Sequence, residues 1–206
     1  MELMIAITIV AGYLLGNLNG AVIMSHLMGD DVRKHGSGNA GLTNFVRNYG
    51  ANRSLMVILI DGLKAIVACV LGGLLLKNYL GFQTGAALGG AAVMLGHVFP
   101  AFLKFHGGKG ILSSLFVGLV VDWRVALIAL GLFALAYVFT GYVSLGSLLG
   151  AVTYGVGFWF FNQNNMVITV CGIFMCLLAT FMHRQNIVRL VQGTERRTNL
   201  FKKEKK

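Results

Sequence analysis

Long runs of apolar residues, separated by short polar stretches, are the feature that most limits what this chain can fold into. Hydrophobic residues occupy 56% of the 206 positions and charged residues only 12%, whereas a soluble domain carries roughly 25% charged residues. A stretch of about 20 apolar residues can cross a bilayer as a helix. We therefore predict an all-α polytopic membrane protein, with candidate spans at Leu3–Met28, Ser54–Leu76, Thr84–Leu103, Ile111–Val121, Val125–Thr140, Tyr142–Phe161 and Met166–Met182.

The segment Ile111–Val121 is too short to cross by length alone. At 1.5 Å per residue it extends roughly 16 Å, which is well below the ~30 Å hydrocarbon core. The charge distribution nevertheless favours a crossing. If all seven segments cross and the N-terminus lies outside, fourteen of the 17 lysines and arginines fall on the cytoplasmic side, as the positive-inside rule expects. We predict about seven transmembrane helices, one of them short, with a cytoplasmic C-terminus; five or six crossings are the alternatives.

No internal repeat or linker divides the chain, so we expect a single domain over residues 1–206. Residues from about 194 to 206 form a short basic tail on the predicted cytoplasmic side. The net charge is +10, but the basic residues gather in a few loops and in this tail. That pattern favours an anionic membrane surface and anionic substrates as partners over nucleic acid. The 3 cysteines lie in apolar spans and lack the spacing of a metal site or a disulfide framework.

The few polar residues gather in four clusters on the predicted cytoplasmic side. Glycine permits unusual backbone conformations and lysine adds a mobile positive charge, so a glycine-lysine loop is suited to binding phosphate. Each cluster alone has an ordinary explanation, as a turn or as a basic anchor at a helix end. Their joint occurrence on one face favours a phosphate site. The clusters are residues 36–44 with Arg47, residues 96–110, residues 142–144, and residues 183–195.

Several better-known catalytic motifs are absent. A Walker A loop requires Ser or Thr after its lysine, but Lys109 is followed by Gly110. Neither a Gly-x-Ser-x-Gly nucleophile elbow nor a His-Glu-x-x-His zinc motif occurs. His26 and Asp31 have the His-x-x-x-x-Asp spacing of soluble-headed glycerolipid acyltransferases, but the surrounding motifs of that family are missing. We interpret His26 as an interfacial residue, and we predict no metal and no cofactor.

Together and in order, the clusters resemble the signatures of the bacterial acyl-phosphate:glycerol-3-phosphate acyltransferases. Asp61-Gly62-Leu63-Lys64 also resembles the Asp-x-x-Lys of that family, and the resemblance covers nearly the whole chain. It implies seven membrane helices in the bacterial cell membrane and an active site open to the cytoplasm. The implied reaction moves a fatty acyl group from acyl phosphate to the 1-hydroxyl of glycerol 3-phosphate, giving lysophosphatidate and phosphate in phospholipid biosynthesis.

The resemblance also implies the site residues. Residues 107–110 and Ser37 should hold acyl phosphate. The residues that should position glycerol 3-phosphate are Arg47, Lys104, Ser144 and His183. The implied catalytic residues are Ser37, Asn39, Lys104, Ser144, His183 and Asn186. The implied substrate-binding residues are Gly38, Thr43, Asn44, Arg47, His97, Gly107, Gly108, Lys109 and Gly110.

The chemistry fits these residue types. Acyl phosphate is a mixed anhydride that is already activated, so the protein needs no covalent nucleophile. It must hold two anionic phosphates together and offset their repulsion. No carboxylate stands out as a general base, because Asp61 is expected to pair with Lys64 three residues later and Glu195 with a basic residue. We therefore expect a phosphate oxygen of the donor to accept the hydroxyl proton, with acceleration supplied largely by positioning.

Three departures from the family pattern leave alternatives open. Gly141 stands where the family commonly has Arg, His106 stands where Lys is usual, and residues 111–114 replace a Val-Ala-Thr-type continuation. A diverged paralogue with another acyl acceptor fits these changes as well. A non-enzymatic membrane carrier of an organic phosphate, or a structural membrane subunit, is the alternative to an enzyme. Expected partners are the two substrates, the lipid bilayer and, through functional coupling, the enzyme that makes acyl phosphate.

Overall fold

The computed structural model describes residues 1–198, which contain ten α-helices, two 3₁₀ helices and no strand. The predicted basic tail therefore lies mostly outside the described residues. The α-helices are α1 Glu2–Gly16, α2 Gly20–Leu27, α3 Leu42–Tyr49, α4 Ala51–Leu76, α5 Phe82–Val98, α6 Ile111–Val121, α7 Trp123–Thr140, α8 Val143–Phe161, α9 Met166–Met182 and α10 Arg184–Val191. The 3₁₀ helices are Val32–Lys34 and Ala101–Leu103.

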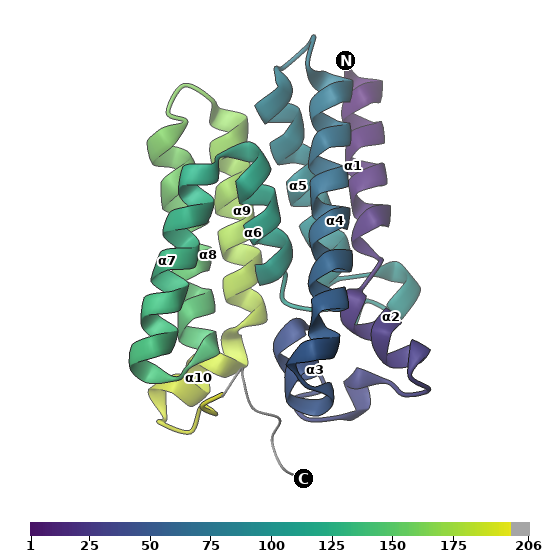
Figure 1. The fold of residues 1–206 in the computed structure, drawn as a ribbon. Helices are drawn as coiled ribbons and strands as arrows, with labels where there is room; N and C mark the ends of the chain where they lie inside the picture. The colour runs from purple at the N-terminus through teal and green to yellow at the C-terminus, as the bar shows by residue number, and fades with distance from the viewer. Residues whose placement is uncertain (199–206) are drawn as a thin grey trace.

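Helices run up and down between two ends of the molecule, so the predicted all-helical membrane fold is confirmed (Figure 1). Within the described residues, five helical segments are long and apolar enough to cross a membrane. The α9 helix meets that test together with α10, from which it is bent by 60°. The α6 helix begins and ends at the predicted residues but has only 11 of them. A count of seven crossings stays a prediction.

The predicted first span is interrupted, and this corrects its description as one helix. The α1 helix ends at Gly16, and α2 starts at Gly20 after Asn19 caps it by accepting a hydrogen bond from Val22 N–H at 3.0 Å. The average hydropathy of the run hides this break, because the many apolar residues on both sides outweigh Asn17 and Asn19. The long polar interruption between the first two spans also contains a helix, α3, which packs Phe45 against Val32 and Val57.

Small residues bring the helices of one half, α1, α4 and α5, into close contact. A Cβ on Gly96 would lie 2.1 Å from the Tyr13 carbonyl oxygen, and one on Gly85 would lie 2.2 Å from that of Gly72. Such positions accept only glycine, and close backbone approach is how membrane helices pack. The helices α7, α8 and α9 form the other half, and α6 lies between the halves (Figure 1).

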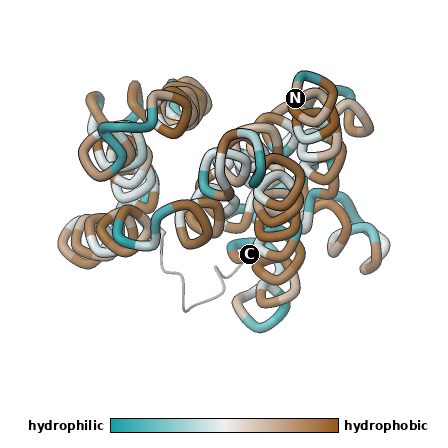
Figure 2. Tube along the Cα trace, turned by 90° about the horizontal axis from the view of Figure 1, so that it is seen from above, coloured by the Kyte–Doolittle hydropathy of each residue, from teal (hydrophilic) through white to brown (hydrophobic). Residues whose placement is uncertain are grey.

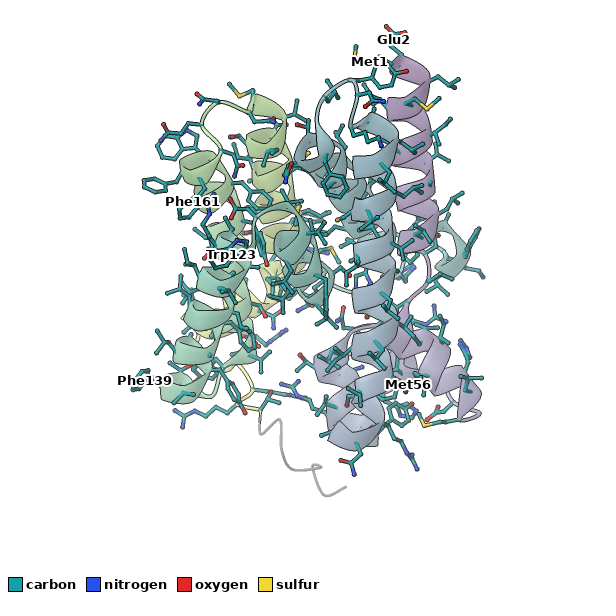
Figure 3. All side chains as sticks on the ribbon, turned by 45° about the horizontal axis from the view of Figure 1, so that its top comes forward. Met1, Glu2, Met56, Trp123, Phe139 and Phe161 are labelled. Carbon is teal, nitrogen blue, oxygen red and sulfur yellow. The ribbon has the colours of Figure 1, made fainter. Side chains whose placement is uncertain are left out.

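The outward surface of the long helices is apolar. Viewed from above, hydrophobic residues follow the helices throughout both halves (Figure 2). Phe139 projects away from the bundle (Figure 3) and is 81% exposed, and Trp123 is 61% exposed. Exposed apolar surface of this extent is suited to lipid. The short helices α2, α3 and α10 gather at the end opposite the N-terminus, where the polar clusters also meet.

Candidate active site

A cavity of about 940 Å³ lies between the two halves at the end opposite the N-terminus. All four predicted clusters contribute to its lining, although they are far apart in sequence. Its volume is at the upper end of the range typical of small-molecule sites. Of the predicted site residues, those that line it are Ser37, Gly38, Asn39, Thr43, Asn44, Arg47, His97, Gly107, Lys109, Gly110, Ser144, His183 and Asn186.

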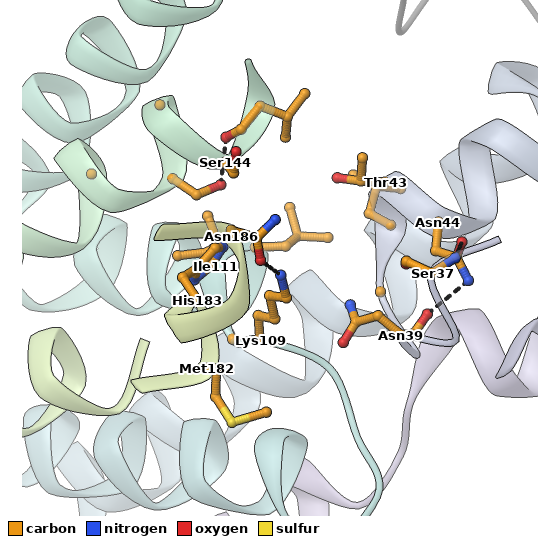
Figure 4. Close-up of a pocket in the computed structure, with 18 of the residues that line it drawn as sticks. Ser37, Asn39, Thr43, Asn44, Lys109, Ile111, Ser144, Met182, His183 and Asn186 are labelled. Carbon is orange, nitrogen blue, oxygen red and sulfur yellow. Dashed lines mark hydrogen bonds between the residues drawn. The ribbon is translucent and has the colours of Figure 1, made fainter. Parts of the chain in front are cut away.

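Lys109 occupies the centre of this cavity. Figure 4 shows its side chain between Asn186 and His183 on one side and Ser37 and Asn39 on the other. Its ammonium group donates a hydrogen bond to the side-chain oxygen of Asn186. Burial lowers the pKa of Lys109 to about 8, partly offset by the charge of Glu195. The ammonium therefore stays largely protonated at neutral pH and can bind an anion.

Glu195 binds the side-chain NH₂ group of Asn186. Its carboxylate accepts hydrogen bonds from the Asn186 amide and from Arg189 Nε, both at 2.7 Å. The expected pairing of Glu195 with a basic residue is thus confirmed. Burial alone would raise the pKa of Glu195, but the hydrogen bonds from Arg189 and Asn186 outweigh it and hold the pKa below its usual value. The chain Lys109–Asn186–Glu195 fixes which way the asparagine amide points.

His183 lines the cavity at the junction of α9 and α10. Its Nδ1 is 2.8 Å from the carbonyl oxygen of Ala179. A carbonyl can only accept, so the imidazole donates from Nδ1 and a neutral ring leaves Nε2 as a hydrogen-bond acceptor. Burial, together with the neighbouring charge of Lys109, lowers the pKa of His183 to about 4, so the ring is neutral at neutral pH. His183 is therefore suited to accepting a hydrogen bond from a substrate hydroxyl.

The glycines of the second cluster pack tightly against the end of α5. A Cβ on Gly107 would lie 2.0 Å from the carbonyl oxygen of His97, and one on Gly108 would lie 2.2 Å from His97 Nε2. Gly108 N–H donates to the His97 carbonyl oxygen at 3.1 Å. Gly108 is not among the residues that line the cavity, and its N–H already donates to the main chain, so its predicted substrate-binding role stays a prediction. Gly110 has φ 82° and precedes the first residue of α6.

Lys104, a predicted catalytic residue, lies away from the cavity. It lies at the exposed end of the 3₁₀ helix Ala101–Leu103, in a left-handed conformation with φ 53°, and it does not line the cavity. Its carbonyl oxygen is 2.6 Å from Nδ1 of His106. The sequence alone could not separate Lys104 from Lys109, because both lie in one basic loop only five residues apart. The structure brings only Lys109 into the cavity.

Asn44 borders the cavity, but its polar atoms build the first cluster. Its side-chain amide donates to the carbonyl oxygens of Val32 and His35 at 3.0 Å and of Asn39 at 3.1 Å. Its side-chain oxygen accepts from Ser37 N–H at 3.0 Å. These bonds hold Ser37 and Asn39 at the cavity edge. Asn44 thus positions its neighbours, and its predicted substrate-binding role stays a prediction.

The predicted Asp61–Lys64 pair is confirmed, with Nζ and Oδ1 2.7 Å apart. Both side chains are buried on α4, and Lys64 also donates to the carbonyl oxygens of Gly16 and Leu18 at the break between α1 and α2. His97 joins this group, with Nδ1 2.8 Å from Lys64 Nζ. The sequence analysis did not connect His97 with the pair. The signal was present, because ionisable residues inside a membrane span usually have partners.

The described end of the chain packs against α7 beside the cavity. The prediction of a short basic tail did not anticipate these contacts. Thr198 N–H donates to the Gly141 carbonyl oxygen, and Tyr137 OH donates to that of Thr198, both at 3.0 Å. Arg47 donates to the Thr198 hydroxyl, which ties α3 to the other half. The Arg197 side chain lies 3.5–3.6 Å from where a Cβ of Gly141 would be.

Arg196, which precedes this contact, lines the cavity as well. Sequence reasoning placed it only in a generic basic tail. Its position directly after Glu195, at the end of the fourth cluster, was the available signal. The cavity thus combines a polar rim with an apolar wall, and the cations that line it are Arg47, Lys109, Arg184, Arg189 and Arg196. Such an arrangement can bind an amphiphilic molecule by an anionic head and an apolar chain.

Comparison with known proteins identifies the family. A family model described as glycerol-3-phosphate acyltransferase matches residues 6–193. The glycerol-3-phosphate acyltransferase of Thermoanaerobacter sp. (strain X514) is 41% identical over 193 residues, covering 92% of this chain and 93% of the relative. That of Desulfotalea psychrophila is 37% identical over 184 residues, covering 89% and 93%.

Solved structures agree with this result. PlsY, an integral membrane glycerol 3-phosphate acyltransferase crystallised in its glycerol 3-phosphate form, is similar with a TM-score of 0.85 and 30% identity. The match covers 95% of this chain and 96% of PlsY. The lysophosphatidic acid form of PlsY gives a TM-score of 0.83. The chain therefore belongs to the glycerol-3-phosphate acyltransferase family and is an integral membrane acyltransferase.

Proposed function

We propose that this protein transfers a fatty acyl group from acyl phosphate to the 1-hydroxyl of glycerol 3-phosphate, releasing lysophosphatidate and phosphate. The observation that carries the proposal is the cavity, which places Lys109 between the first and fourth clusters and continues into an apolar wall. The solved forms of PlsY, named for glycerol 3-phosphate and lysophosphatidic acid, support the same acceptor and product. The enzyme works in the bacterial cell membrane with the cavity open to the cytoplasm, the N-terminus outside and the C-terminus inside.

Two phosphates bind on either side of Lys109 in this proposal. Acyl phosphate lies against Ser37, Asn39 and the loop of residues 107–110. Glycerol 3-phosphate lies on the side of Asn186 and His183, near Arg47. Two dianions repel each other strongly in a poorly screened cleft, and the central ammonium group of Lys109 offsets that repulsion for both. Lys104 has no part in the site, because it lies outside the cavity.

The reaction follows from this placement. The 1-hydroxyl oxygen of glycerol 3-phosphate attacks the acyl carbonyl carbon, the carbon–oxygen bond of the anhydride breaks, and phosphate leaves with the bonding pair. His183 orients the hydroxyl by accepting its hydrogen bond at Nε2. A phosphate oxygen of the donor takes the hydroxyl proton. His183 does not take it, because protonated His183 would be a second buried cation beside Lys109. Holding both reactants in attack geometry supplies much of the acceleration.

The fatty chain follows the apolar wall between α6, α7 and α8. Residues from these three helices line the cavity. On α8, the lining residues extend from Ser144 to Tyr154, a span of ten positions. At 1.5 Å per residue this is about 15 Å of apolar depth. The apolar lining residues are Ile111, Leu112, Leu115, Ala129, Leu130, Phe133 and Tyr154.

Because the donor is a reactive anhydride, we also propose functional coupling to the enzyme that makes it.

The test is an activity assay on the purified full chain in detergent and in bilayers. Palmitoyl phosphate and glycerol 3-phosphate should give equal amounts of lysophosphatidate and phosphate. The Lys109→Ala variant should lose about 100-fold or more in kcat/KM, since a buried charge-assisted contact is lost. Lys77→Ala, at an exposed lysine at the opposite end of α4, is the matched control and should stay active.

A folded protein that gives no acylated product would refute the proposal. The organic-phosphate carrier makes the opposite prediction in sealed vesicles, where glycerol 3-phosphate would cross the membrane unchanged. Flux of intact substrate without acylation would favour the carrier. Flux that is absent while lysophosphatidate accumulates supports the enzyme.

A further inference from the structure

Asp61, Lys64 and His97 form a buried polar group directly behind the glycine loop. Their side chains are at most 5% exposed. Lys64 Nζ lies 2.7 Å from Asp61 Oδ1 and 2.8 Å from His97 Nδ1, and it also donates to the carbonyl oxygen of Leu18. Gly20 N–H donates to Asp61 Oδ1 at 3.1 Å. The ammonium group therefore sits among acceptors on every side.

These contacts determine which nitrogen of His97 carries its proton. An ammonium group has three N–H donors and no acceptor, and the three shortest contacts of Lys64 are Asp61, Leu18 and His97. The His97 Nδ1 must therefore accept. The competing arrangement would have Nδ1–H donate to Asp61 Oδ1, but that separation is 3.6 Å, too long for a hydrogen bond. The proton of the neutral ring is consequently on Nε2.

The Nε2 atom lies against the glycine loop, and His97 is one of the residues that line the cavity. Nε2 lies so close to Gly108 that a Cβ there would be 2.2 Å away. We propose that Lys64 is a positioning residue that fixes His97 in its Nε2–H tautomer, so that His97 presents a neutral hydrogen-bond donor to an oxygen of the acyl phosphate. The chemical identity of that ligand rests on the proposed function above.

Two of the histidines that line the cavity, His97 and His183, then have opposite roles. His183 donates from Nδ1 to a main-chain carbonyl and offers an acceptor at Nε2, whereas His97 accepts at Nδ1 and offers a donor at Nε2. A neutral donor helps to bind the acyl phosphate without adding a charge that would retain the phosphate product. The acceptor orients the attacking hydroxyl. One residue type thus serves each substrate differently because a different partner binds its Nδ1.

The tautomers can be measured directly. Protonated and unprotonated imidazole nitrogens have well-separated ¹⁵N shifts, so the full chain labelled with ¹⁵N-histidine in bilayers reports these two rings together with the other 3 of its 5 histidines. The His97→Gln and His183→Asn variants assign the two sets of signals. We expect an unprotonated Nδ1 at His97 and a protonated Nδ1 at His183, which serves as the internal control. A protonated Nδ1 at His97 would overturn the proposal, whatever the activity of the preparation.

Kinetics provide the second test. The paired variant Asp61→Leu/Lys64→Met removes both buried charges together, because removing one would leave the other unpaired. We expect the protonated fraction of His97 Nδ1 to rise and the KM for palmitoyl phosphate to increase about tenfold, with the KM for glycerol 3-phosphate within about twofold. Equal losses for both substrates with an unchanged tautomer would show a purely structural role and refute the proposal.

If the paired variant does not fold, the comparison of His97→Gln with His97→Phe tests whether His97 acts as a hydrogen-bond donor. Glutamine can still present an amide N–H near the position of Nε2, whereas phenylalanine presents none. Glutamine should keep at least about fivefold more kcat/KM for palmitoyl phosphate than phenylalanine. Equal activity of the two variants would contradict a donor role. Absence of acylation by the wild type would instead refute the proposed function and leave the tautomer measurement valid.

Discussion

Gly108→Ala tests the packing of the phosphate loop most directly. The added Cβ would lie 2.2 Å from His97 Nε2 and 2.9 Å from the carbonyl oxygen of Ala40, where ordinary contact begins at 3.4 Å. The loop or the ring must therefore move by roughly 1 Å. His97 cannot yield easily because its Nδ1 is bound by Lys64. Overpacking of this kind costs about 1–3 kcal/mol of stability.

Activity should suffer more than stability. A displacement of about 1 Å in a positioning element can lower the rate by ~100-fold, so kcat/KM for palmitoyl phosphate should fall by about that factor. The measurement is initial rates of phosphate release at saturating glycerol 3-phosphate, alongside thermal unfolding in detergent. Gly131→Ala on α7 is the matched control, because a Cβ there meets nothing within 4 Å. That change should leave activity intact and slightly favour the helix.

A Gly108→Ala variant with kcat/KM within about threefold of wild type would refute the packing explanation. It would mean that the loop tolerates a side chain and that its glycines serve another purpose. A loss of activity in Gly131→Ala of the same size would show that any added methyl group disturbs the bundle. In that case the effect at Gly108 could not be assigned to the loop.

Two further predictions concern the lysines of the second cluster. Lys104→Ala should change kcat/KM less than about threefold, because this lysine is exposed and outside the cavity; a loss as large as that of Lys109→Ala would restore it to the site. The rate should also fall as the pH rises through about 8, where Lys109 loses its proton. In Lys109→Arg any remaining activity should lack this decline, since arginine stays charged; an unchanged decline in the pH–rate profile would assign it to another group.

The scarcity of polar residues explains why the sequence predicted so much of the site. In a chain that must present apolar side chains to lipid, a polar cluster at a span end is unusual, and thirteen predicted residues do line one cavity. The helices were predictable for the same reason. What hydropathy could not indicate were features made by specific hydrogen bonds, such as the break capped by Asn19 and the loop built around Asn44.

Long-range contacts were equally hidden. Nothing in the local pattern distinguishes Lys104 from Lys109, and only the fold of residues 101–108 against α5 directs them differently. The return of Thr198 to Arg47 joins positions 151 residues apart. The resemblance implied that His97 binds substrate, but the sequence did not indicate that its Nδ1 contacts Lys64 on another helix.

The contact between Arg197 and Gly141 has a consequence for how relatives should be compared. An alignment records position by position which residue is present, and at 141 it would register a lost arginine. The space beside that glycine nevertheless contains an arginine side chain, supplied from 56 positions later in the chain. Within such a family, an arginine side chain can therefore lie beside column 141 although another column encodes it. Gain or loss of arginine at positions 141 and 197 should be examined as a pair.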